Sequence, residues 1–167
     1  MNPMSSKKFF FLFLASLVAL FLFKIYIATP FMVFGQSMEP SFHDKEYIWV
    51  ERITPKLGKI KRGDVVIIKN PTNPSVSFIK RVIALPNERI EIIAGKVKIY
   101  NLEHPEGFFL AEPYVIQKDK RSMPLLGLGE DEYFVMGDNR PDSYDSRNFG
   151  PIKKRDIIGK PLFKFAD

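Results

Sequence analysis

The chain has 167 residues, 46% hydrophobic and 26% charged, a balance typical of a globular protein. It contains no cysteine and only two histidines, His43 and His104, which excludes disulfide bonds and thiolate zinc sites and leaves little for another metal site or a Ser-His-Asp triad. The net charge of +6 is concentrated in residues 52–62, which lack the interleaved aromatic residues typical of nucleic-acid surfaces. We expect that stretch to be a solvated loop that at most contacts anionic lipid headgroups.

Residues 9–28 form the first predicted element, an apolar run interrupted only by Lys24. A helix of this length spans about 30 Å, the thickness of the hydrocarbon core of a bilayer. A cleaved signal peptide is the alternative, because residues 9–23 alone would fit its apolar core of about 7–15 residues. No small-x-small cleavage pattern precedes the polar region, so we expect an uncleaved transmembrane anchor.

Basic residues at the two ends of this run predict its orientation. Lys7 and Lys8 precede it and place the N-terminus in the cytoplasm by the positive-inside rule. The amine of Lys24 can extend to the far interface. We therefore expect a cytoplasmic stub and single-pass plasma-membrane anchor at residues 1–28, followed by one extracytoplasmic domain at residues 29–167.

The hydrophobic pattern beyond residue 30 is short and alternating, which is typical of strands rather than helices. The spacing leaves no room for crossover helices, so we expect a mainly β domain of packed antiparallel sheets or a partly closed barrel. Residues 31–34 are either a first strand or an apolar rim that touches lipid, and we favour the strand. The other expected strands are residues 47–52, 64–69, 77–85, 89–93, 96–100, 109–116, 132–136 and 157–165, with separators such as 70–74 and 126–129.

Ser37 lies nine residues beyond the apolar run, so even an extended connection keeps it within about 30 Å of the bilayer. Most serines in such a loop are turn formers or caps. Here Gly35 permits a close backbone approach and Pro40 stiffens the exit, so the Ser37 hydroxyl and its amide can face a carbonyl group. That amide is the candidate oxyanion donor.

Lys80 is embedded in the apolar strand expected at residues 77–85. Alternation places it on one face with Phe78 and Val82, while Arg81 points to the other face. A buried lysine can lose its charge and act as a base for serine, whereas arginine stays protonated and needs a carboxylate. A solvated strand lysine is the alternative.

The polar loop after the strand expected at residues 132–136 is rich in Asp, Asn, Ser and Arg. A calcium-binding turn is possible but is disfavoured by its two arginines. We expect a charge-assisted pair to hold the loop, either Asp145 with Arg147 or Asp138 with Arg140. Ser143 would then be free to orient the lysine amine.

Together these motifs resemble type I signal peptidases of the bacterial form over nearly the whole chain. The matching segments are residues 35–40, 62–66, 80–86 and 137–150, in order behind an anchor. The resemblance implies that Ser37 is the nucleophile, Lys80 the general base and Ser143 the partner that orients it. It also implies that Asp145 and Arg147 support the site structurally.

The sequence departs from the family pattern at three positions. Gly35 stands where many members carry a serine that contributes to the oxyanion hole, so we expect backbone amides there, that of Ser37 foremost. Ala84 and Asn87 replace two glycines that are common after the lysine. The short interval before the last segment implies a compact member. The endoplasmic reticulum branch, with histidine where Lys80 stands, is disfavoured.

The expected function is that of a membrane-bound serine endopeptidase that removes signal peptides from exported preproteins, with no cofactor or metal. The family preference for small residues before the cut implies shallow apolar pockets. An extended substrate would reach them by adding a strand beside residues 31–34, and we expect Phe34 and Gln36 to contact it. Preproteins and membrane lipid are the expected partners, and nucleic acid is not.

Two other classes remain open. The same serine and lysine could act on other substrates, as in self-cleaving repressors, pilus and conjugation peptidases or mitochondrial inner-membrane peptidases. Alternatively, the chain could be a non-enzymatic, membrane-anchored β module that binds partners through an apolar rim.

Overall fold

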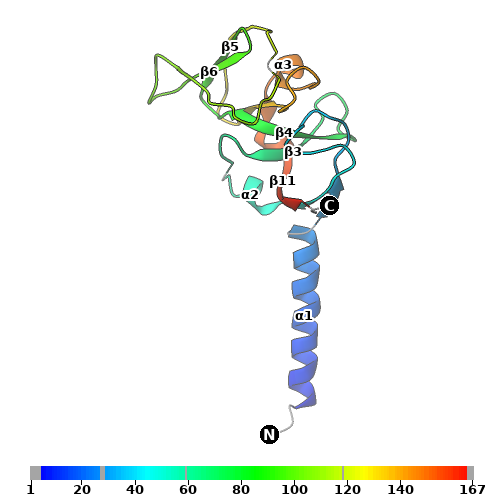
Figure 1. The fold of residues 1–167 in the computed structure, drawn as a ribbon. Helices are drawn as coiled ribbons and strands as arrows, with labels where there is room; N and C mark the ends of the chain where they lie inside the picture. The colour runs from blue at the N-terminus through cyan, green and yellow to red at the C-terminus, as the bar shows by residue number, and fades with distance from the viewer. Residues whose placement is uncertain (1–4, 27–28, 59, 118, 165–167) are drawn as a thin grey trace.

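The computed structural model describes residues 5–26, 29–58, 60–117 and 119–164. It consists of one long helix standing below a β-rich domain (Figure 1). The predicted end of the apolar run at residue 28, the side chain of Lys24 and the last residue of the strand expected at 157–165 lie outside what is described.

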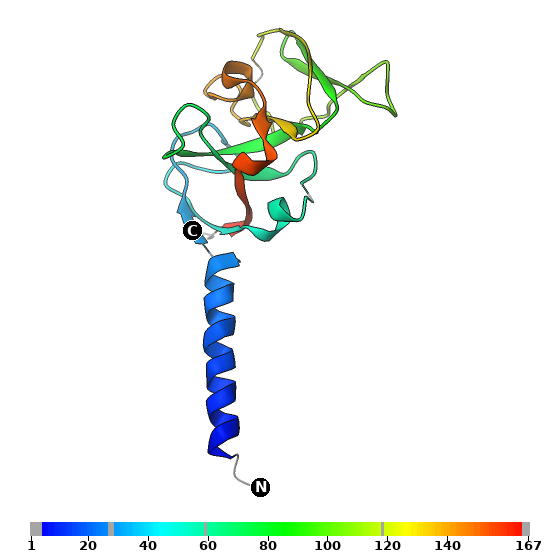
Figure 2. The ribbon, with the colours of Figure 1, turned by 180° about the vertical axis from the view of Figure 1, so that it is seen from behind.

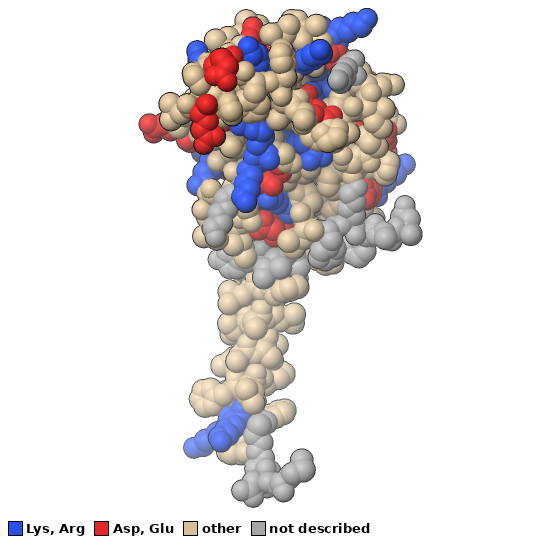
Figure 3. All heavy atoms as spheres, turned by 60° about the vertical axis from the view of Figure 1, so that its left-hand side comes forward, with Lys and Arg blue, Asp and Glu red and all other residues tan. Residues whose placement is uncertain are grey.

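The long helix is α1 (Ser6–Tyr26). Its residues 6–23 have a mean hydropathy of 1.9, and none of them is buried inside the protein. Residues 9–23 of α1 include no charged residue, and Figure 3 shows basic side chains near the N-terminal end of the helix. The length and composition of this helix are those of a membrane-spanning segment. The protein leaves its apolar surface uncovered, as such a segment requires.

The domain contains two antiparallel sheets. The seven-stranded sheet has the order β1-β2-β11-β3-β4-β9-β10, and the four-stranded sheet has the order β7-β6-β5-β8. The strands of the first are β1 (Thr29–Met32), β2 (Tyr47–Glu51), β3 (Val65–Lys69), β4 (Ser77–Ala84), β9 (Glu132–Met136), β10 (Ile152–Lys153) and β11 (Ile157–Lys164). Those of the second are β5 (Arg89–Ile93), β6 (Lys96–Tyr100), β7 (Phe108–Phe109) and β8 (Met123–Gly127). Short helices are α2 (Ile53–Lys56), α3 (Ser146–Phe149) and the 3₁₀ turn η1 (Lys154–Asp156). The predicted mainly β, antiparallel fold behind an apolar helix is confirmed.

Strand β4 is the element from which the core is built. Its side chains contribute to three apolar clusters: Ile79 to one, Val82 to a second, and Ile83 with Ala84 to a third. Alternate side chains of a strand point to opposite faces, and the irregular pairing between Val82 and Ala84 lets consecutive residues join the same cluster. A side chain near the middle of β4 is therefore surrounded by protein.

Two expectations about the strands are wrong. Of the strand expected at residues 109–116, only Phe109 lies in a strand, at the end of β7 (Phe108–Phe109). Pro113, which has no amide hydrogen to donate, lies in the part that forms no strand. Leu126 and Gly127, expected in a separator, are the last residues of β8 and pair with β5. The favoured first strand is present, shifted to Thr29–Met32 as β1 at the edge of its sheet.

Candidate active site

The amine of Lys80 contacts the hydroxyl of Ser37. Lys80 Nζ lies 2.7 Å from Ser37 Oγ, although the two residues are far apart in the sequence. Lys80 sits inside β4, between β3 and β9, and only 3% of it is exposed. Its amine also lies 5.2 Å from the centre of the Phe78 ring, on the same face of the strand. The structure thus brings the two predicted catalytic side chains together.

Burial shifts the ionisation of Lys80. Loss of water around the amine is the largest effect and lowers its pKa from 10.5 to about 8. Arg147 lowers the pKa further by charge repulsion, whereas Asp145 and Asp138 raise it. The protonated form still predominates at pH 7, but the neutral fraction is far larger than for an exposed lysine, and a neutral amine can accept a proton.

The loop that carries Ser37 is tied to the rest of the domain by its backbone. Gly35 adopts φ +84°, which glycine permits, and its N–H donates to Asp44 Oδ1 at 2.7 Å. The carbonyl of Ser37 accepts from the backbone N–H of Asn139 at 3.1 Å, and the carbonyl of Gln36 accepts from Asn139 Nδ2 at 3.1 Å. No residue in the described part of the chain accepts a hydrogen bond from the backbone N–H of Ser37.

Gly137 lies where the two loops of the site meet. A Cβ at this position would be 2.3 Å from the carbonyl oxygen of Ser37 and 2.3 Å from Ser143 Oγ. Both distances are far below van der Waals contact, so only glycine allows the loops to approach this closely. Sequence analysis had placed Gly137 in a motif without giving it this role.

Ser143 is buried beside this junction. Its hydroxyl lies close enough to Asp145 to help lower the pKa of that carboxyl group, but it forms no hydrogen bond of good geometry with any described residue. Within residues 5–26, 29–58, 60–117 and 119–164, the Lys80 amine donates one hydrogen bond, to Ser37. The expected orientation of Lys80 by Ser143 therefore stays a prediction.

The expected pair of Asp145 and Arg147 is present. Arg147 Nε donates to Asp145 Oδ1 and Nη2 to Oδ2, each at 2.8 Å. The same carboxylate accepts the Gly137 N–H at 3.0 Å and caps α3. Burial alone would raise the pKa of Asp145, but the bonds and charge of Arg147, together with the Gly137 N–H, hold it below its usual value.

The alternative pair of Asp138 with Arg140 is wrong. Asp138 pairs instead with Arg81 of β4, whose Nε and Nη2 donate to its two oxygens at 2.8 and 2.5 Å. Arg81 also donates to the carbonyl of Gly63 and stacks on Tyr114, with its guanidinium carbon 4.1 Å from the ring centre. The carboxylate that Arg81 was expected to need is thus supplied by the polar loop.

The segment between β7 and β8 supplies two carboxylates that sequence analysis missed. Glu112 pairs with Arg140, and Asp119 accepts from Arg147 Nη1 at 2.9 Å. Residues 109–116 were assigned to a strand, so their side chains were not considered as partners. No local signal marks these carboxylates, apart from the presence of arginines in the polar loop that need partners.

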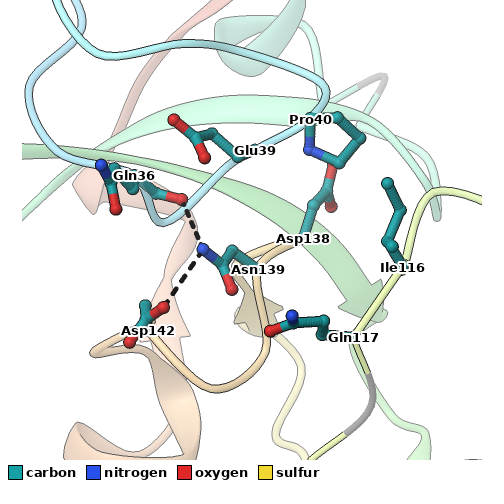
Figure 4. A pocket seen from close by; sticks show the side chains of 8 residues that line it. All are labelled: Gln36, Glu39, Pro40, Ile116, Gln117, Asp138, Asn139 and Asp142. Carbon is teal, nitrogen blue, oxygen red and sulfur yellow. Dashed lines mark hydrogen bonds between the residues drawn. The ribbon is translucent and has the colours of Figure 1, made fainter.

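A cavity of about 320 Å³ opens beside the Ser37 loop (Figure 4). It is lined by Gln36, Glu39, Pro40, Ile116, Gln117, Asp138, Asn139 and Asp142. Gln36, an expected substrate contact, is among them, whereas Phe34 is 73% exposed on the adjoining surface. Most of the lining residues are polar, whereas the pockets expected for the signal-peptide side are apolar. Among the described residues, no group of three or more His, Cys, Asp or Glu side chains is placed to hold a metal ion.

The fold and the contact between Lys80 and Ser37 indicate a class of protein. This class is a β-rich hydrolase that would use a lysine amine where other serine hydrolases use histidine. The family model described as "Signal peptidase, peptidase S26" matches residues 6–166. The chain belongs to this family.

Individual relatives agree with the family model. Signal peptidase I of Bacillus amyloliquefaciens is 36% identical over 163 residues, which cover 91% of this chain and 78% of the relative. Signal peptidase IB of Staphylococcus aureus is 32% identical over 160 residues, covering 89% and 83%. A crystal structure of a signal peptidase I from Enterococcus faecalis has a TM-score of 0.53 and 29% identity, covering 61% of this chain and 96% of that one. The chain is therefore a peptidase, and its family supports cleavage of the signal peptides of exported preproteins.

The ion pair between Asp138 and Arg81 makes a testable contribution to stability. Its side chains are 0% and 13% exposed, so Asp138→Ala leaves a mostly buried cation without its carboxylate. We expect the free energy of unfolding to fall by about 3–5 kcal/mol, measured by denaturant titration in detergent.

Asp131→Ala is the matched control, because its pair with Lys153 is about half exposed on both sides. It should cost about 0–1 kcal/mol. An equal loss of unfolding free energy in the two variants would show that burial does not determine how much the pair of Asp138 and Arg81 stabilises the protein.

Proposed function

We propose that the protein is a membrane-anchored serine endopeptidase that cleaves signal peptides with a catalytic pair formed by Ser37 and Lys80. The contact of 2.7 Å between the buried amine and the hydroxyl carries this proposal. Neither side chain is reactive alone, because a serine hydroxyl is a weak nucleophile and an exposed lysine is protonated. Burial of one beside the other removes both obstacles.

In the proposed reaction, neutral Lys80 accepts the proton of the Ser37 hydroxyl while Ser37 Oγ attacks the carbonyl carbon of the scissile bond. The amide bond breaks as the lysine passes its proton to the leaving nitrogen, which becomes the N-terminus of the mature protein. The signal peptide remains as an ester on Ser37. Lys80 then takes a proton from water as the water oxygen attacks the ester, and it returns that proton to Ser37 Oγ as the ester bond breaks. The signal peptide leaves as a carboxylic acid, and the serine hydroxyl and neutral amine are restored.

The negative charge that develops on the carbonyl oxygen needs hydrogen-bond donors. The backbone N–H of Ser37 is the proposed donor, since no described residue accepts it. Gly35 has no side chain to contribute a second bond, but its contact with Asp44 holds the loop in place. We assign Ser143, Asp145 and Arg147 to positioning: Asp145 binds both Arg147 and Gly137, and Gly137 touches the Ser37 loop.

The substrate would approach as an extended segment beside β1, which pairs with β2 on one side and is the edge strand of its sheet. An edge strand offers unpaired backbone groups to an incoming peptide. Phe34 and Gln36 directly follow this edge and are the proposed contacts.

We also propose that residues 1–28 form the cytoplasmic stub and single membrane anchor, and that residues 29–167 form an extracytoplasmic domain. The uncovered apolar surface of α1 and the basic residues Lys7 and Lys8 before it support this topology. An anchor joined directly to β1 would keep the site near the bilayer, where signal peptides of exported preproteins are located.

Replacement of either member of the pair tests the mechanism. Ser37→Ala and Lys80→Ala should each lower kcat for a purified preprotein by at least about 10³-fold, because the nucleophile or the base is lost. The measurement is appearance of the mature N-terminus in detergent.

Ser75→Ala and Lys96→Ala are the matched controls, since both residues are exposed and lie outside the site. They should cleave at the rate of the unaltered protein. Turnover retained by either pair variant would contradict the mechanism.

The pH dependence of cleavage provides a second test. The base works only when neutral, so kcat/KM should rise as the pH increases through the pKa of Lys80, which is about 8, and level off above it. The rise should be absent from the residual activity of Lys80→Ala. A rate that stays constant between about pH 6 and about pH 10, on either side of that pKa, would exclude Lys80 as the base.

The topology can be tested by cysteine labelling, because the chain has no cysteine of its own. In intact spheroplasts, a membrane-impermeant maleimide should label Ser75→Cys but label Ser5→Cys only after permeabilisation. Labelling of Ser5→Cys in intact spheroplasts would reverse the proposed orientation.

A further inference from the structure

One end of the domain combines basic and apolar side chains next to the start of β1. Thr29, the first residue of β1, pairs with Val50 of β2, and Glu51 at the end of β2 pairs with Lys160 of β11. Helix α2 follows directly after β2 and packs on β11. Both ribbon views accordingly show α2 at the end of the domain nearest α1 (Figures 1 and 2).

Apolar side chains project from this end into solvent. Ile53 and Leu57, at the two ends of α2, are 37% and 62% exposed, and Leu162 of β11 is 47% exposed. Helix α2 is held in place by Glu51, whose Oε2 accepts the N–H groups of Ile53 at 2.7 Å and Thr54 at 2.9 Å. The exposed apolar groups therefore sit on a fixed element.

A basic hollow of about 450 Å³ adjoins α2 on the same side. Three basic side chains, one carboxylate and three apolar side chains line it: Lys56, Lys154, Arg155, Asp131, Pro55, Ile157 and Ile158. A second carboxylate, that of Asp156, follows Arg155 in η1, so cations still outnumber carboxylates on this surface. Lys153 pairs with Asp131 at 3.7 Å, which offsets that negative charge further. Figure 3, which brings this side of the domain forward, shows basic side chains on the domain above the C-terminal end of α1, with acidic side chains among them.

We propose that this surface, formed by α2, η1 and the exposed Leu162, docks on the bilayer and holds anionic phospholipid headgroups in the basic hollow. The proposal rests on the membrane anchoring proposed above. Apolar side chains beside cations match the interface, where acyl chains and phosphates lie within a few ångströms of each other. Attachment to α1 keeps the surface at that interface, so a lipid headgroup is favoured over a soluble phosphate.

The proposed docking would fix the tilt of the domain on its anchor. The covalent connection between α1 and the domain leads into β1. A single connection of this kind does not fix the tilt of the domain relative to the bilayer. Contact through α2 and η1 adds a second point of attachment on the bilayer. The orientation of the Ser37 loop relative to the membrane would then depend on the lipid composition.

A fluorophore attached to the full-length protein can test docking. Leu57→Cys and, as a control at the far end of the domain, Leu102→Cys are each labelled with an environment-sensitive dye and placed in nanodiscs. One set of nanodiscs contains phosphatidylcholine alone, and the other contains phosphatidylcholine with phosphatidylglycerol. We expect a blue shift and quenching by lipid-attached quencher at position 57 only with phosphatidylglycerol, and no response at position 102.

Charge variants test whether the cations of the basic hollow are responsible for docking. Removing its cations by Lys56→Gln, Lys154→Gln and Arg155→Gln together should abolish the response at position 57. The matched control removes the same charge by Lys96→Gln and Lys98→Gln in β6 and Lys120→Gln in the segment before β8, and it should keep the response. High salt should also weaken it, because a Debye length of about 3 Å at 1 M screens surface charges.

Several outcomes would overturn the proposal: equal responses in the two lipids, equal effects of the two triple variants, or a shift caused by inorganic phosphate in phosphatidylcholine nanodiscs. The last would assign the hollow to soluble phosphate. The test is independent of catalysis, because Ser37→Ala should dock normally and the hollow variant should cleave normally in detergent. Failure of docking and failure of the proposed peptidase activity are therefore distinguishable.

Discussion

The site depends on keeping one lysine amine out of water and against a serine hydroxyl. A charged amine is strongly hydrated, so the protein must surround Lys80 completely to lower its pKa to about 8. Placement on β4 achieves this, because β4 is paired on both sides and its neighbours belong to the apolar clusters of the core. A lysine on an edge strand would remain hydrated. The position of one strand within the sheet is thus a chemical requirement as well as a structural one.

Around this amine, buried arginines form ion pairs that position the loops between the strands. Arg81 joins β4 to the loop of Asp138, and Arg147 joins Asp145 to Asp119. Each guanidinium binds more than one partner, which fixes direction as well as distance. The long segment before β8 needs no regular structure, since its carboxylates are positioned by these pairs.

Sequence alone predicted what local pattern determines. Alternation identified β4 and the inward face of Lys80, and an apolar run interrupted only by Lys24 identified α1. Pairing between distant charges could not be predicted in this way, because a motif shows that Asp138 needs a cation without showing which one. The residue nearest in sequence, Arg140, was the wrong choice, and Glu112 was hidden in a segment assigned to a strand. Proline at position 113 was the available warning against that strand.

The absence of a Cβ at Gly137 constrains which substitutions the two loops can accept during evolution. The carbonyl of Ser37 and the hydroxyl of Ser143 occupy the space that any larger residue would need. A substitution that displaces one loop displaces the other as well, so neither can drift while its counterpart stays constant. We therefore expect substitutions in the two segments to be compatible only in combination, so a chimera that takes them from different proteins would join mismatched surfaces.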